Sequence, residues 1–377
     1  MSCVCLFLNA KKEKDLFVSF GGVFSSRPIS EAYIGLQYNF LGKTAVSIVA
    51  NTYFGKLHNS VTAGFRLDFP FTIPFYWKTT FTIDGWDYFK SNSTFFEDTK
   101  PSYLIKNETF WGAEVGLPFS NKGKFTVNFK NGLLENDYYQ TDQFLSTDTV
   151  DITQFFFNKL NLRLERNSLN NQYYSSKGSK LILNAGYVQG VEINRPGSTS
   201  ILSSDSNERV GHDWFQFGIN FEKYFEFNEK YSVGLEFSGV HSTQDFFNNY
   251  TSSVLLAPQY SPIPETRTQF IQNFAAHTYA SLGVKNVFNI YRTLDLRLEG
   301  YAFVPYATLV DDNKRAKFSP NIKATKRNYI GSAILVFKSP LGPVSFAANY
   351  MDHRDEKWSF LFNFNFLVFN RKALEIN

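Results

Sequence analysis

Residues 359–366 read Ser-Phe-Leu-Phe-Asn-Phe-Asn-Phe and place a large aromatic residue at every second position, at Phe360, Phe362, Phe364 and Phe366. Successive side chains of a β-strand point to opposite faces of the sheet. This stretch therefore has one apolar face and one mostly polar face. It predicts a strand whose apolar face meets an apolar environment.

The same alternation recurs along the chain. Leucine alternates with polar residues in 160–165 and 294–299, and other apolar residues do so in 61–69, 125–130 and 215–222. Period two with charges on one face is the pattern of a strand. Charged side chains would be costly against lipid, so the polar face is expected to line the inside of a barrel.

Such segments, taken end to end, predict about 16 strands, an even number as in bacterial outer-membrane barrels. The connections alternate between short turns and long polar loops, which is the arrangement of a transmembrane barrel with loops on the outer side. The connection 167–178 is the exception, because it is long but falls on the short-turn side. The predicted strands are 15–25, 31–42, 44–54, 59–70, 75–88, 107–118, 123–138, 149–166, 179–191, 212–227, 231–246, 270–288, 292–306, 327–338, 343–353 and 357–370.

Composition excludes several classes of protein. The 377 residues include 42 Phe and 21 Tyr, and the net charge is only +4, with no basic block suited to nucleic acid. Cys3, Cys5 and the five scattered histidines lack metal-ligand spacing, so neither a metal nor another cofactor is expected. No apolar run approaches the roughly 18 residues of a membrane helix, which leaves a closed barrel as the membrane structure.

A soluble β-sandwich or a set of β-domains would also explain the alternation. It would not explain the order of short and long connections. The expected fold is therefore all-β, a 16-stranded antiparallel transmembrane β-barrel in the outer membrane of a Gram-negative bacterium, in contact with membrane lipids and lipopolysaccharide. The tryptophans indicate an aromatic girdle at the membrane interfaces: Trp77, Trp86, Trp111, Trp214 and Trp358.

Three stretches resemble the bacterial surface antigen family, which comprises outer-membrane assembly and translocation barrels. They are the turn 339–344 (Ser-Pro-Leu-Gly-Pro-Val), the aromatic strand 358–369, and the basic, glycine-containing connection 166–178. More narrowly, 256–270 resembles the barrel attached to patatin-like phospholipases. The resemblance implies an anchoring or translocating barrel with a periplasmic or surface protein partner.

The chain departs from that family in three respects. The family's Val-Arg-Gly-Phe motif is not matched, because no Gly follows Arg267 and Arg209-Val210-Gly211 lies in the preceding long connection. The periplasmic domains that precede the family's barrel are not seen before the first strand. The Gly-x-Ser-x-Gly nucleophile motif is absent, and Ser, His and Asp form no recognisable triad, so enzyme activity is not expected.

The sequence predicts three parts: an N-terminal segment 1–14 that is non-native or periplasmic, a barrel 15–370, and a C-terminal tail 371–377. The apolar run 4–8 lacks a basic region before it and does not predict a competent signal peptide. Because a barrel of this kind must be exported, we expect either a non-native start or a fragment of a longer precursor.

Two candidate sites follow. Arg267 is expected to enter the lumen and pair with Asp295 or Glu299, unless it is an ordinary solvated loop arginine. The first and last strands must meet, and Gly21 and Gly22, which lack side chains for cross-strand packing, are expected to face the last strand near Phe362 and Phe364 in a labile seam.

Three functions remain open on the sequence. The first is a barrel that anchors or translocates a partner or passenger domain. The second is a subunit of the machinery that assembles outer-membrane proteins. The third is a passive porin or a channel for apolar solutes.

Overall fold

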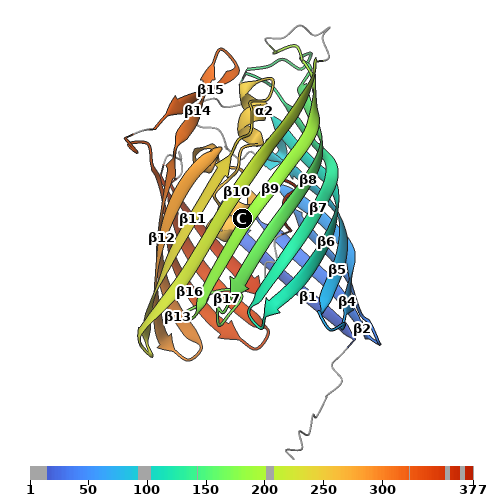
Figure 1. Ribbon diagram of the computed structural model, residues 1–377. Helices are drawn as coiled ribbons and strands as arrows, with labels where there is room; N and C mark the ends of the chain where they lie inside the picture. The colour runs from blue at the N-terminus through green and yellow to red at the C-terminus, as the bar shows by residue number, and fades with distance from the viewer. Residues whose placement is uncertain are drawn as a thin grey trace, which may run out of the picture.

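A computed structural model shows how the alternating segments pair. Sixteen strands form a closed antiparallel barrel, whose shape is seen in Figure 1. Strand β1 pairs with β18 and closes it. The structure describes residues 15–91, 103–141, 143–200, 208–321, 323–352, 357–365 and 370–376. The barrel strands are β1 (Leu16–Ser25), β2 (Glu31–Leu41), β3 (Ala45–Gly55), β4 (His58–Phe69), β5 (Phe75–Asp87), β6 (Leu104–Ser120), β7 (Gly123–Tyr138), β8 (Asp151–Asn167), β9 (Ser179–Arg195), β10 (Glu208–Asn228), β11 (Tyr231–Ser242), β12 (Thr278–Tyr291), β13 (Leu294–Pro305), β16 (Asn328–Ser339), β17 (Gly342–Met351) and β18 (Trp358–Asn365).

The predicted fold class, a 16-stranded antiparallel barrel, is confirmed. The side chains alternate as expected: Phe360 and Phe362 are 50% and 41% exposed on the outer wall, whereas Ser359 and Asn363 are buried inside. An apolar outer belt around a polar interior is the distribution that a lipid bilayer requires, because charged side chains facing lipid are destabilising.

Two of the five tryptophans do not belong to the expected interfacial girdle. Trp111 and Trp358 are exposed on the outer wall, but Trp86 and Trp214 are buried inside the barrel. The reason is strand parity, since Trp86 lies two residues from the inward-facing Asp84 and must share its face.

The largest boundary difference concerns the predicted strands 231–246 and 270–288. β11 ends at Ser242 and β12 begins only at Thr278, because residues 243–277 leave the wall and fold into the barrel. Phe274 and Ile271 in this stretch are buried in an apolar cluster with wall residues such as Phe303. Their apolar pattern therefore reflects packing inside the barrel, which period alone does not distinguish from a strand.

The long connections contain elements that the sequence analysis did not predict. Residues 306–327 carry a hairpin, β14 (Ala307–Asp312) and β15 (Arg315–Pro320), which stands at the long-loop rim (Figure 1). Asn313 and Lys314 at its tip both have positive φ, at 55° and 64°, as a tight two-residue hairpin turn requires. The short helices are α1 (Tyr88–Ser91), α2 (Tyr250–Leu255) and α3 (Pro264–Thr268), with the 3-10 turn η1 (Gln272–Phe274). Among the described residues, no helix is long and apolar enough to cross a membrane.

Candidate functional site in the barrel lumen

Residues 243–277, here called the lumen loop, occupy the long-loop half of the barrel. Helix α2 is capped at its N-terminus by Asn249, whose side chain accepts a hydrogen bond from the backbone N–H of Ser252 at 2.9 Å. The loop is tied to the wall at several points. Trp86 Nε1 donates to the Thr268 carbonyl at 3.2 Å, and Asn249 Nδ2 donates to the Tyr138 hydroxyl at 2.6 Å.

Glu265, on α3 of the lumen loop, reaches the seam where the barrel closes. Its Oε1 lies 3.1 Å from Nη1 of Arg27, which follows β1. Its Oε2 accepts hydrogen bonds from Asn349 Nδ2 on β17 at 2.9 Å and from the Ser359 hydroxyl on β18 at 2.5 Å. One fully buried carboxylate thus joins the two sides of the seam from within. The sequence carries no signal for this role, because the partners lie at opposite ends of the chain.

The seam residues named from the sequence lie where the two strands pair. Gly22 faces Phe364, Gly21 faces Asn365, and Phe24 faces Phe362. The rings of Phe24 and Phe362 lie 6.4 Å apart on the outer wall. Whether this seam opens more readily than other strand pairs stays a prediction.

The partners expected for Arg267 need correction. Arg267 does lie in the barrel, but Nη2 pairs with Glu375 Oε1 at 3.2 Å. Glu299 pairs with Arg297, two residues away on the same face of β13, at 2.8 Å. Asp295 pairs with Lys338 Nζ at 2.6 Å. It lies at the short-turn end of β13, while the lumen loop enters from the opposite rim, so distance separates it from Arg267.

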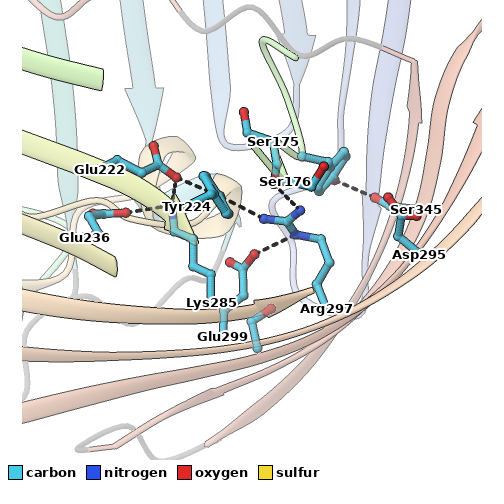
Figure 2. A network of polar contacts seen from close by, with 12 residues as sticks. Ser175, Ser176, Glu222, Tyr224, Glu236, Lys285, Asp295, Arg297, Glu299 and Ser345 are labelled. Carbon is cyan, nitrogen blue, oxygen red and sulfur yellow. Dashed lines mark hydrogen bonds and ion pairs between the residues drawn. The ribbon is translucent and has the colours of Figure 1, made fainter. Parts of the chain in front are cut away.

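Arg297 and its partners hold the connection 168–178 inside the short-turn end of the barrel (Figure 2). Arg297 Nη1 donates to the Ser175 carbonyl at 2.7 Å, Nη2 to the Tyr224 hydroxyl at 3.2 Å, and Nε to Glu299 at 2.8 Å. The Tyr174 hydroxyl lies 2.7 Å from the Ser345 hydroxyl on β17. The connection 168–178, which is long although it lies on the short-turn side, is therefore a second segment that occupies the lumen.

A second charge cluster adjoins the first on the wall (Figure 2). Lys285 Nζ of β12 lies 2.6 Å from Glu222 Oε1 of β10 and 2.7 Å from Glu236 Oε2 of β11. Glu222 and Glu236 are direct partners in the strand register. The lysine therefore offsets the repulsion between two carboxylates that face each other. These charged contacts join neighbouring strands of the wall.

Residues 371–376 of the predicted tail 371–377 form the third segment in the lumen, and residue 377 lies outside the described residues. Residues 370–376, here called the lumen segment, lie within the barrel (Figure 1). Asn370 Nδ2 donates to Asn51 Oδ1 and to Ser60 Oγ, both at 2.9 Å. The predicted barrel limit at 370 falls beyond β18, which ends at Asn365, and residues 366–369 lie outside the described residues.

A cavity of about 330 Å³ with both polar and apolar lining lies between the lumen loop, the lumen segment and the wall. Its lining includes both signs of charge: Lys106, Glu108, Arg163, Arg371, Lys372 and Glu375. In the described part of the chain, no group of three or more His, Cys, Asp or Glu residues is placed to hold a metal ion. The arrangement offers hydrogen bonds and apolar contacts side by side, as a peptide segment can use.

These features define the class: the protein is a transmembrane β-barrel of the outer-membrane type, with a filled lumen. No family model and no curated protein matches the sequence. Among solved structures it is similar to BamA from Haemophilus ducreyi lacking POTRA domains 1–3, at 11% identity and TM-score 0.60, over 94% of this chain and 71% of that one.

Two structures of CdiB are also similar. The one from Acinetobacter baumannii has 10% identity and a TM-score of 0.53, over 93% of this chain and 60% of that one. The one from Escherichia coli has 12% identity and a TM-score of 0.52, over 94% of this chain and 64% of that one. Likeness at this identity shows the fold, and the fold is that of these outer-membrane barrels.

Proposed function

We propose that this barrel anchors or translocates a partner polypeptide at the outer membrane of a Gram-negative bacterium. The observation that carries the proposal is the Glu265 bridge. The barrel closes at β1 and β18, and a carboxylate of the lumen loop binds both sides of that closure. Displacement of the lumen loop would therefore loosen the seam and clear the long-loop half of the lumen in one movement.

Three further features support this function. The fold is similar to that of BamA and CdiB barrels. The lumen wall carries charged residues of both signs, such as Lys159, Glu222 and Arg297, beside apolar clusters, so it offers contacts to both the backbone and the side chains of a polypeptide. The apolar outer belt meets lipid acyl chains, and we include lipopolysaccharide of the outer leaflet among its contacts. Residues 256–270 resemble the barrel attached to patatin-like phospholipases, so a patatin-like domain is the first partner to test. We propose no enzymatic activity for the barrel itself.

A passive porin fits the structure less well. The lumen loop, the connection 168–178 and the lumen segment all lie in the barrel, and the cavity that borders the lumen loop and the lumen segment has a volume of about 330 Å³. A subunit of the assembly machinery would share the seam and differ in its partner. Purification from native membranes followed by mass spectrometry separates these functions, because it identifies the companions.

The seam itself is tested by a disulfide. Val23 and Asn363 face each other across β1 and β18, at a spacing that suits a cysteine pair. In a background with Cys3 and Cys5 replaced by serine, we expect oxidation of Val23→Cys/Asn363→Cys to block delivery of the partner and reduction to restore it. The control is Asn184→Cys/Gly218→Cys, which joins β9 to β10 away from the seam. Full delivery by the oxidised seam variant would contradict the proposal.

A further inference from the structure

Two wall lysines bind the lumen segment through its backbone. Lys130 Nζ on β7 donates to the carbonyls of Lys372 and Ala373 at 2.9 and 3.2 Å. Lys159 Nζ on β8 donates to the carbonyls of Leu374 and Glu375 at 2.9 and 3.0 Å. Two ammonium groups thus bind four consecutive carbonyls, and such contacts do not depend on the side chains of the bound segment.

The two lysines form an unusual pair of wall residues. Lys130 and Lys159 are direct partners in the register of β7 and β8, so two like charges face each other across neighbouring strands. Like charges in this position destabilise a sheet unless something neutralises them. Among the described residues, the hydrogen-bond acceptors of the two ammonium groups are the four carbonyls and the Gln216 side chain, at 3.3 Å from Lys159. The pair is therefore built around its occupant.

The wall also recognises a backbone donor. The N–H of Ala373 donates to Glu108 Oε2 on β6 at 2.8 Å. The Ala373 side chain is fully buried among apolar residues, so a small residue fits there. Within the segment, Glu375 Oε2 accepts from the Lys372 N–H at 3.1 Å and closes a turn without help from the wall. The site thus combines a donor pair, an acceptor and a small apolar pocket.

We propose that Lys130, Lys159 and Glu108 form a peptide-binding site, that the lumen segment occupies it as an internal ligand, and that a peptide segment of another chain can replace it. This inference goes beyond the proposed function, since a peptide site in the lumen does not require transport. A vacated site would deprive the two lysines of four carbonyl acceptors, which is costly unless water or another peptide replaces them. Peptide carbonyls are the replacement that matches the donor spacing.

The geometry also shows why the internal ligand can leave. The cavity of about 330 Å³ borders the lumen segment at Arg371, Lys372 and Glu375, so one flank of the segment is not packed. Its polar side-chain anchors are few, chiefly Asn370 with Ser60 and Glu375 with Arg267, and Ala373 and Ile376 add apolar contacts. Polar contacts beside open space exchange readily for contacts with water or with a second peptide.

The experiment uses the purified barrel and a variant that lacks residues 370–377. The probe is a fluorescent peptide of the sequence Asn-Arg-Lys-Ala-Leu-Glu-Ile, followed by fluorescence anisotropy. We expect the truncated barrel to bind the probe at least tenfold more tightly than the full chain, where the tethered segment competes. Lys130→Met/Lys159→Met in the truncated barrel should weaken binding at least tenfold. A probe that is N-methylated at its alanine should also bind more weakly, because it lacks the donor for Glu108.

A second pair of measurements keeps the test valid if the truncated barrel does not fold. In the full chain with Cys3 and Cys5 replaced by serine, Ser60→Cys/Asn370→Cys locks the segment in place when oxidised. We expect the probe to bind the reduced form and not the oxidised form.

Three outcomes would overturn the proposal. One is a folded truncated barrel, or a reduced double-cysteine chain, that does not bind the probe. Another is equal binding by the lysine-pair variant. The third is binding of inorganic phosphate without binding of the peptide, which would make the lysine pair an anion site.

Discussion

Arg297 donates from Nη1 to the carbonyl oxygen of Ser175 at 2.7 Å, although 122 residues separate them in the chain. The contact joins a barrel strand to the connection between β8 and β9, and Figure 2 shows the guanidinium between this carbonyl and Glu299. The bonds also explain why a connection on the short-turn side is long: it supplies a filler for the end of the lumen. The barrel wall and its contents are therefore stabilised together.

Replacement of Arg297 by methionine should release this connection. The change leaves Glu299 without its cation, and breaking one side of a buried ion pair typically costs about 3–5 kcal/mol. We expect lower stability in urea and faster tryptic cleavage at Lys177. The control is Arg66→Met, which breaks a half-exposed pair with Asp68 and should cost no more than about 1 kcal/mol. Equal effects of the two changes would show that Arg297 is not a special anchor.

Replacement of Glu265 by alanine should loosen the seam selectively. Asn349 and Ser359 lose their shared acceptor, and Arg27 loses a buried carboxylate. We expect the amides of β1 and β18 to exchange with deuterium at least tenfold faster, while those of β9 and β10 change little. The matched control is Glu135→Ala, whose carboxylate accepts from Gln154 far from the seam. Uniform loss of protection around the barrel would contradict a local role for Glu265.

The docking of the β14–β15 hairpin should depend on pH through His277. Burial of this imidazole lowers its pKa from 6.5 to about 4, and its ring lies 5.2 Å from that of Phe318 on β15. His277 binds a proton below about pH 6.5 in the undocked loop but only near pH 4 in the docked one. The free energy that favours docking therefore falls as the pH drops from 6.5 to 4. The full effect is about 3 kcal/mol.

The measurement is the hydrogen-exchange protection of hairpin amides between pH 7 and pH 4. We expect protection to fall with pH in the native chain and to stay level in His277→Gln. His241 is exposed and supplies the control, because His241→Gln should keep the pH dependence. Retention of the pH dependence in His277→Gln would show that another group is responsible.

The wall could be predicted from the sequence because its signal is local. Each strand shows an alternation of period two in its own residues. The alternation of Phe360 with Asn363 was enough to assign the first to the outer face of the barrel and the second to the inner face. The same alternation places Trp86 on the inner face, because it lies two residues from the charged Asp84. The contents of the lumen were not predictable in this way. Glu265, Arg297 and Lys130 meet partners that are distant in the chain, and no periodicity reports such contacts.

The cluster around Lys285 offers a test of how the wall tolerates its charges. Lys285→Met leaves Glu222 and Glu236 facing each other without a cation, and we expect it to lower the free energy of unfolding by about 3–5 kcal/mol. The triple variant Lys285→Met/Glu222→Gln/Glu236→Gln removes all three charges and should recover most of that loss, since no buried charge is left unpaired. Both are measured by urea unfolding in the same lipid. A triple variant as unstable as the single one would mean that the lysine acts through packing against Tyr301, whose ring centre lies 6.0 Å from Nζ, and not through charge.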